Sequence, residues 1–135
     1  DADEQTANAM LRVAGQLDRR WLDKHDIDKF PCEDLWTIDR LWVKYSNGRF
    51  GFSVQIKIYQ SLGGTREYYN SEIWRKFGEA VGWRQKGEWS RYWQLGLTLN
   101  VNPPKGHLPL GSFLSVFPGG SRWVSFAQRC LDCNV

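Results

Sequence analysis

Eight tryptophans among 135 residues constrain the fold of this chain more than any other feature of its sequence. Aromatic residues make up 15% of the chain, within an apolar share of 41% that is ordinary for a folded globular protein. A chain of this length forms one hydrophobic core, and such a core rarely needs so many indole rings. Either the core is therefore unusually aromatic, or some rings line a surface that receives a flat partner.

Charge and hydropathy argue against two broad classes of protein. The net charge of +3 is too small to indicate a nucleic-acid-binding protein unless the basic residues cluster. No apolar run approaches the ~20 residues of a membrane-spanning helix, although peripheral association with a membrane is left open. The sequence starts at Asp1 without a signal peptide or an initiator methionine, so we expect a mature or excised fragment.

Cysteine content predicts thiols rather than a disulfide framework or a metal site. The chain has three cysteines, an odd number that argues for a reducing compartment. Cys130 and Cys133 form a C-x-x-C pair close to the end of the chain. A structural zinc site needs four ligands, and only His25 and His107 could complete one. We interpret the pair as incidental thiols.

Apolar periodicity predicts three helices. The first covers residues 2–17. The second starts at Pro31 and stops before Gly48, because proline suits a first helical turn and glycine adopts the left-handed conformation that ends a helix. Trp42 falls on the apolar face of this second helix and is expected in the core. The third covers residues 72–81, with Asn70 or Ser71 as its cap.

Other segments are ambiguous or irregular by pattern alone. Apolar residues alternate over residues 50–58, which favours a strand, although the spacing of Val54 and Ile58 also fits a helix. The chain becomes irregular after Trp83, and residues 113–126 are interpreted as a loop with a short element.

Catalysis has little support in the sequence. A nucleophile–base pair needs a histidine near a serine or cysteine, and the chain has two histidines. His25 lies in a charged connector that looks solvated. His107 lies in a loop, where it either makes a structural hydrogen bond or faces a ligand. No phosphate-binding loop, dinucleotide fingerprint or zinc-protease motif is present.

Residues 83–93 interleave aromatic and basic side chains. The segment contains Trp83, Arg84, Lys86, Trp89, Arg91, Tyr92 and Trp93. This pattern suits single-stranded nucleic acid, whose bases stack on rings. It suits a flat anionic macrocycle equally well, because rings can sandwich its face while basic groups meet its carboxylates. The third alternative is that these rings pack in the core.

Three ordered blocks carry a specific resemblance. They are FPCEDLWTIDRLWVKYSNGRFGFSVQ at residues 30–55, FGEAVGWR at residues 77–84 and PKGHLP at residues 104–109. In this order and spacing the chain resembles the Genomes Uncoupled family, the tetrapyrrole-binding accessory proteins of magnesium chelatase in cyanobacteria and plastids. The resemblance covers residues 2–110, and residues 111–135 are unassigned. We expect residues 1–135 to form one tetrapyrrole-binding-like domain.

The resemblance implies an all-α fold, a compact multi-helix domain with a groove like a cupped hand and a long irregular aromatic loop. It therefore predicts a helix at residues 50–58 despite their alternation. Family members bind protoporphyrin IX or magnesium protoporphyrin IX, act through the large subunit of magnesium chelatase in chlorophyll synthesis, and perform no chemistry themselves. It implies no nucleic-acid partner and no metal site. It places the protein in the cytoplasm or at the thylakoid of a cyanobacterium, or in the plastid stroma.

The resemblance also implies a set of ligand-binding residues. One wall of the groove is expected to contain Ile27, Phe30, Leu35 and Trp36. The aromatic loop is expected to contribute Trp89, Arg91, Trp93 and Leu97, and the closing block His107 and Leu108.

Two positions depart from the family pattern. Ala7 stands where some porphyrin-binding members carry an arginine that can pair with a propionate, and Lys24 stands where they carry an aromatic wall residue. These departures motivate an alternative hypothesis. In it the chain is a drifted interaction or sensor module of a larger signalling or effector protein, with a non-porphyrin ligand.

Overall fold

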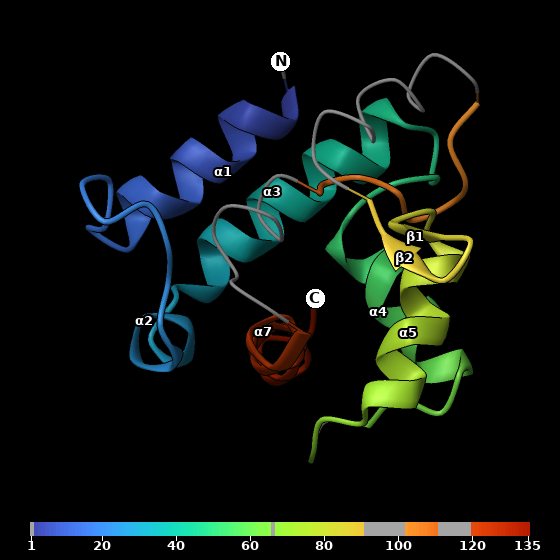
Figure 1. The fold of residues 1–135 in the computed structure, drawn as a ribbon. Helices are drawn as coiled ribbons and strands as arrows, with labels where there is room; N and C mark the ends of the chain where they lie inside the picture. Colours follow the sequence, from blue (N-terminus) through green and yellow to red (C-terminus); the bar gives the residue numbers. More distant parts are fainter. Residues whose placement is uncertain (1, 66, 91–101, 111–119) are drawn as a thin grey trace.

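The chain is mainly helical in the computed structural model, which describes residues 2–65, 67–90, 102–110 and 120–135 (Figure 1). The helices are α1 (Ala2–Val13), α2 (Lys24–Asp28), α3 (Cys32–Tyr45), α4 (Phe52–Ser61), α5 (Ser71–Ala80) and α7 (Gly120–Asp132). Two short strands, β1 (Arg84–Gln85) and β2 (Glu88–Trp89), pair antiparallel with Arg84 opposite Trp89. The expectation of an all-α fold is confirmed.

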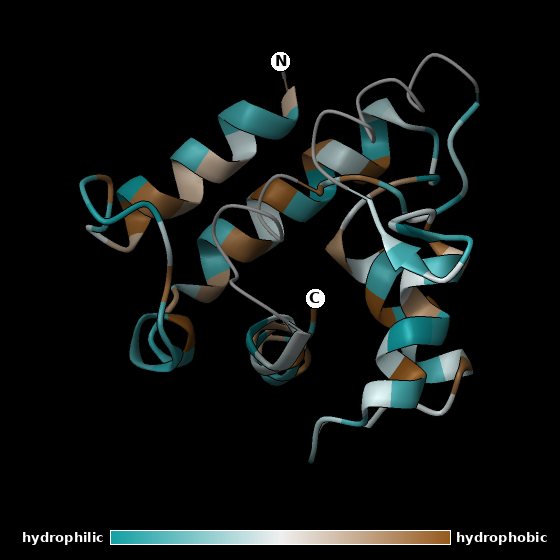
Figure 2. Cartoon of the chain, viewed as in Figure 1, coloured by the Kyte–Doolittle hydropathy of each residue, from teal (hydrophilic) through white to brown (hydrophobic). Residues whose placement is uncertain are grey.

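Helix α3 lies in the middle of the molecule, with α1 on one side and α4 and α5 on the other (Figure 1). It begins directly after Pro31, and Glu33 and Asp34 stand in its first turn, where the helix dipole favours negative charge. Past its end, Gly48 adopts a left-handed φ of 83°. Hydrophilic and hydrophobic residues stand side by side along α1 and α3, as expected of helices with one buried face (Figure 2).

The ends of the other two predicted helices depend on local chemistry. Helix α1 stops at Val13 rather than at residue 17, because Gly15 takes a left-handed φ of 72° and turns the chain. Helix α5 is capped by Asn70, whose side-chain oxygen accepts a hydrogen bond from the backbone N–H of Ile73 at 3.0 Å.

Residues 52–61 form a helix, so the strand that alternation alone favours is wrong. The buried residues of α4 are Phe52, Val54, Gln55, Ile56 and Tyr59. They surround much of the helix because α3, α5 and α7 all pack against it. A helix covered on several sides loses the single apolar stripe that sequence periodicity detects.

Helix α7 is longer than the short element expected within a loop at residues 113–126, and it continues to Asp132. Residues 113–119 lie outside the described residues. The buried residues of α7 are Trp123, Val124, Phe126, Ala127 and Cys130. Their spacing of three and four residues is helical, so the signal was present in the sequence. Helix α7 lies between α2 and the pair formed by α4 and α5 (Figure 1).

An aromatic cluster fills the core where α4, α5 and α7 meet. Trp74 stacks on Phe77 at 5.6 Å between ring centroids and lies 5.5 Å from Trp123. Phe77 also contacts Trp83 and Trp123, with centroids 5.5 and 4.6 Å away. Trp74, Trp83 and Trp123 are all buried. Part of the tryptophan excess is therefore explained by an unusually aromatic core.

The interpretation of Cys130 and Cys133 as incidental thiols is wrong for Cys133. Cys32 and Cys133 form a disulfide with 5.3 Å between their Cα atoms, whereas Cys130 is free and buried. The two bonded cysteines are 101 residues apart in sequence and meet because the end of α7 packs against the start of α3. Spacing along the chain carries no signal of this contact.

The turn between α3 and α4 depends on a glycine without a side chain. Gly51 adopts φ 129° and ψ 161°, a conformation open in practice only to glycine. A Cβ atom there would lie 2.8 Å from Asp39 Oδ1 and 3.0 Å from Val43 Cγ2. The same Asp39 oxygen accepts a hydrogen bond from the backbone N–H of Ser53 at 2.8 Å and so caps α4.

We predict that Gly51→Ala lowers the free energy of unfolding by about 3 kcal/mol or more, because strain and a clash with Asp39 combine. Gly48→Ala is the matched control, since Gly48 also has a positive φ but a Cβ atom there would have no neighbour within 4 Å. It should cost only about 1–2 kcal/mol. Urea denaturation of both variants measures the difference, and equal losses would contradict the prediction.

Candidate ligand-binding site

An apolar groove of about 600 Å³ separates α1 from α3. Its lining residues are Ala2, Gln5, Thr6, Ala9, Ile38, Leu41, Trp42, Tyr45, Ser46, Phe50 and Leu108. The volume lies within the range of roughly 300–1,000 Å³ that is typical of small-molecule sites. The groove is one candidate surface for a ligand.

Trp42 forms part of this groove and is not a core residue, which corrects the expectation from its helix face. Its side chain is half-buried, and its indole N–H donates a hydrogen bond to Thr6 Oγ1 at 3.0 Å. Its ring meets Phe50 edge-on at 6.4 Å. On either side of Trp42 along α3, Leu41 and Tyr45 are exposed. The apolar face of α3 therefore continues past the core onto the surface.

All four predicted wall residues lie where α2 ends and α3 begins. Ile27, Phe30 and Leu35 have exposed fractions of 0%, 1% and 0%, so the core covers them. Trp36 is exposed, and its indole N–H donates to the backbone oxygen of Cys133 at 2.5 Å. The structure thus brings the predicted wall together but leaves one of its four side chains accessible.

The predicted aromatic loop is described only at its start. Trp89 is 37% exposed and stacks on Trp74, with 5.2 Å between ring centroids. Arg91, Trp93 and Leu97 lie outside the described residues.

The two residues of the predicted closing block have different surroundings: His107 is in the core and Leu108 lines the groove. His107 is fully buried, and its Nδ1–H donates to the backbone oxygen of Val81 at 2.7 Å. Its own backbone oxygen accepts the indole N–H of Trp83 at 2.8 Å. Of the two sequence interpretations of His107, the geometry favours the structural hydrogen bond. Leu108 lines the groove between α1 and α3.

A basic and aromatic edge near α2 was missed by sequence reasoning. The exposed ring of Trp21 has the guanidinium carbons of Arg19 and Arg122 at 4.3 and 6.0 Å from its centroid. Arg122 belongs to α7 and is distant from Trp21 in sequence, so only the local pair with Arg19 could have been noticed. Guanidinium groups over an indole offer both a flat surface and partners for carboxylates. We call Trp21, Arg19 and Arg122 the Trp21 edge.

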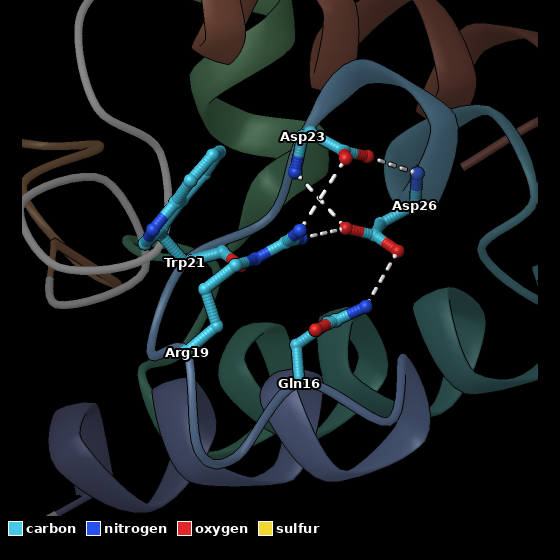
Figure 3. A network of polar contacts seen from close by, with 5 residues as sticks. All are labelled: Gln16, Arg19, Trp21, Asp23 and Asp26. Atoms are coloured by element: carbon cyan, nitrogen blue, oxygen red, sulfur yellow. Dashed lines mark hydrogen bonds and ion pairs between the residues drawn. The ribbon is translucent and has the colours of Figure 1, made fainter.

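Arg19 at this edge is held in place by a polar network (Figure 3). Its guanidinium pairs with Asp26 and, at 3.4 Å, with Asp23. Asp23 and Asp26 form a capping box at the start of α2, and the side chain of Gln16 donates to Asp26 at 3.1 Å. The backbone hydrogen bond to Asp26 lowers the pKa of Asp23 below its usual value. Ion pairs and the capping box therefore give a defined structure to residues 19–26, part of the connector that looks solvated in sequence.

The part of the chain that the structure describes contains neither a metal-binding cluster nor a membrane-spanning helix. There, no group of three or more histidine, cysteine, aspartate or glutamate side chains is arranged to hold a metal ion. Among the same residues, no helix has both the length and the apolar character needed to cross a bilayer.

The buried His107 makes stability depend on pH. Burial lowers its pKa below the usual value, and the hydrogen bond to Val81 opposes that shift without cancelling it. In the unfolded chain the imidazole takes up a proton near pH ~6.5, so below this pH the unfolded state binds more protons and the folded state is less stable.

We predict that the free energy of unfolding falls between pH 7.5 and 5.5, by at most about 1.4 kcal/mol per pH unit from His107. His107→Gln should show a shallower slope, and equal slopes would refute the assignment.

This chain is similar in sequence to known proteins over most of its length. The GUN4-like family model matches residues 1–125. The Ycf53-like protein of Synechocystis sp. is 40% identical over 111 residues, which are 81% of this chain and 44% of that protein. The tetrapyrrole-binding protein, chloroplastic, of Arabidopsis thaliana is 34% identical over 120 residues, which are 84% of this chain and 43% of that protein. The chain thus spans less than half the length of these relatives.

A solved structure shares the fold. The ligand-free structure of Arabidopsis thaliana GUN4 superposes with a TM-score of 0.67 and 27% identity, over 93% of this chain and 79% of that one. The relatives come from a cyanobacterium and from a chloroplast, as the sequence blocks lead us to expect. The chain belongs to the GUN4-like family, the Genomes Uncoupled family that its three sequence blocks resemble.

Proposed function

We propose that this chain binds a tetrapyrrole without transforming it and stimulates magnesium chelatase through the large subunit of that enzyme. One observation carries the binding part of the proposal. The chain is 34% identical, over 84% of its length, to a relative named as a tetrapyrrole-binding protein. The ligand we propose is protoporphyrin IX or its magnesium form.

Exposed aromatic rings provide a physical basis for binding a flat macrocycle. Trp21, Trp36 and Trp89 are all exposed in this structure, beyond the rings that fill the core. Covering on the order of 300 Å² of macrocycle face at ~25 cal/mol per Å² contributes roughly 7 kcal/mol before ordering costs. This is enough for useful affinity without any covalent or metal bond to the protein.

The seat we propose is the face where α2 meets α3. The predicted wall residues gather there, and the Trp21 edge lies beside α2. The Arg19 guanidinium already pairs with Asp23 and Asp26, so Arg122 is the residue of this edge that we propose for a propionate carboxylate. Arg91, Trp93 and Leu97 are proposed to complete this seat. The groove between α1 and α3 is the competing seat, and it holds one predicted residue, Leu108.

A porphyrin titration tests binding and seat together. We predict saturable quenching of tryptophan fluorescence and a shift of porphyrin absorbance at micromolar deuteroporphyrin. Trp93→Ala should weaken binding about tenfold or more, because a stacked ring contributes ~1–3 kcal/mol and ~1.4 kcal/mol corresponds to a factor of ten, with little change in melting temperature. Leu41→Ala, in the competing groove, should leave affinity unchanged.

Two outcomes of that titration decide against parts of the proposal. Absence of saturable binding by the unmodified chain would contradict the tetrapyrrole function. Weakening by Leu41→Ala with none by Trp93→Ala would place the ligand in the groove between α1 and α3 instead.

Stimulation of magnesium chelatase needs its own measurement. We predict that adding the chain to assembled chelatase subunits raises the rate of magnesium insertion at limiting porphyrin, because a bound porphyrin is presented to the large subunit. Trp93→Ala serves as the control and should stimulate less. An unchanged rate with a binding-competent chain would refute the chelatase role alone.

The second candidate function is a module that binds a non-porphyrin ligand, and two residues favour it. Ala7 is buried and offers no charge for a propionate. Lys24 is exposed and paired with Asp28 at 2.7 Å, so it provides no aromatic wall. Spectra of the chain mixed with porphyrin, haem and a bilin distinguish this alternative from the first, because only the first requires a porphyrin response.

A further inference from the structure

We propose that the Cys32–Cys133 disulfide is a redox latch, which holds the end of α7 over the junction of α2 and α3 and restricts tetrapyrrole access to that face. The identity of the gated ligand rests on the function proposed above. The latch itself rests on contacts between α7 and the start of α3.

Three separate interactions join the same two segments. The disulfide links the first residue of α3 to the residue that follows α7. The Arg129 guanidinium donates two hydrogen bonds, at 2.9 and 2.8 Å, to the backbone oxygen of Phe30. The Trp36 indole N–H donates to the backbone oxygen of Cys133. The disulfide is the one covalent tie among them, so it dominates how far the end of α7 can move.

Helix α7 covers the surface that the proposed ligand requires. Ile27, Phe30 and Leu35 belong to one buried cluster with Phe126 and Cys130 of α7, and α2 and α7 pack against each other (Figure 1). These three wall residues are buried, so a macrocycle cannot touch them unless a segment packed around them moves, and α7 is one such segment. Displacement of the end of α7 would expose an apolar surface of the kind that a porphyrin face covers.

The disulfide is open to attack from one side. Cys32 is partly exposed, whereas Cys133 is buried. A thiolate of a dithiol reductant attacks Cys32 Sγ and releases Cys133 as a thiolate, which then takes up a proton. The second thiol of the reductant displaces Cys32, so the reductant leaves as a disulfide and the protein gains two electrons and two protons.

The remaining cysteine does not interfere with this exchange. Cys130 is fully buried, and burial raises the pKa of its thiol well above the usual value, so it stays protonated. Trp123 keeps the first half of α7 in the aromatic core after reduction. Reduction therefore shifts an equilibrium toward an open end of α7 rather than unfolding the helix, and apparent affinity rises with the fraction that is open.

The test compares the unmodified chain with Cys32→Ser, each with and without dithiothreitol. Thiol titration in denaturant should find one thiol in the oxidised chain and three after reduction, as the structure pairs two of the three cysteines. Hydrogen–deuterium exchange should become faster at residues 129–135 on reduction. Deuteroporphyrin affinity, followed by absorbance, should rise about tenfold. Cys32→Ser should match the reduced chain in both conditions and not respond to dithiothreitol.

Each result bears on one part of the inference. Three thiols in the oxidised chain, or unchanged exchange at residues 129–135, would overturn the latch whether or not porphyrin binds. Faster exchange with unchanged affinity would overturn the gating and leave the proposed tetrapyrrole function intact. Absence of porphyrin binding in every sample would overturn the proposed function and the gating, while the exchange data would still decide whether reduction frees α7.

Discussion

The fold depends on the hydrogen bonds that hold the irregular segment at residues 102–110, whose later residues are buried in the core. A chain without regular structure carries unpaired backbone groups into the core, and each one costs free energy unless it finds a partner. The buried Gln55 of α4 donates to the backbone oxygens of Gly106 and Pro109 at 3.1 and 3.0 Å. At the end of the segment, the buried Asp3 of α1 accepts the N–H of Leu110 at 2.7 Å. This segment thus joins α1 to α4 through polar groups.

The same segment explains why Trp83 is in the core, whereas Trp89, six residues later, is exposed. Trp83 fills apolar space with its ring and satisfies the backbone oxygen of His107 with its N–H, two roles that an indole combines. His107 in turn satisfies the last turn of α5 through the oxygen of Val81. Trp89 instead lies exposed, with its ring stacked on the face of Trp74. Two tryptophans of one short stretch therefore serve the core and the surface respectively.

Helix α7 connects this core to the surface where we place the ligand. Trp123 near its start belongs to the aromatic cluster, while Arg129 and Cys133 near its end bind the start of α3. Arg122 reaches the ring of Trp21 on the neighbouring α2 side. One helix therefore contributes to stability at one end and to the accessibility of the candidate site at the other.

The sequence by itself determined the family, the class of ligand to test and the ends of α3 and α5, because caps such as Pro31 and Asn70 act within one turn of the chain. The spacing of residues 52–61 fits both periods, and only the resemblance to the family predicted their helix. The tertiary structure decided which of their side chains are buried, because α3, α5 and α7 all pack against them. It also decided that Cys32 meets Cys133, and that Trp42 lines a groove rather than the core. Contacts between residues distant in sequence arise from tertiary packing. Local sequence patterns indicate which face of a helix is apolar, but they do not indicate which other element will pack against it.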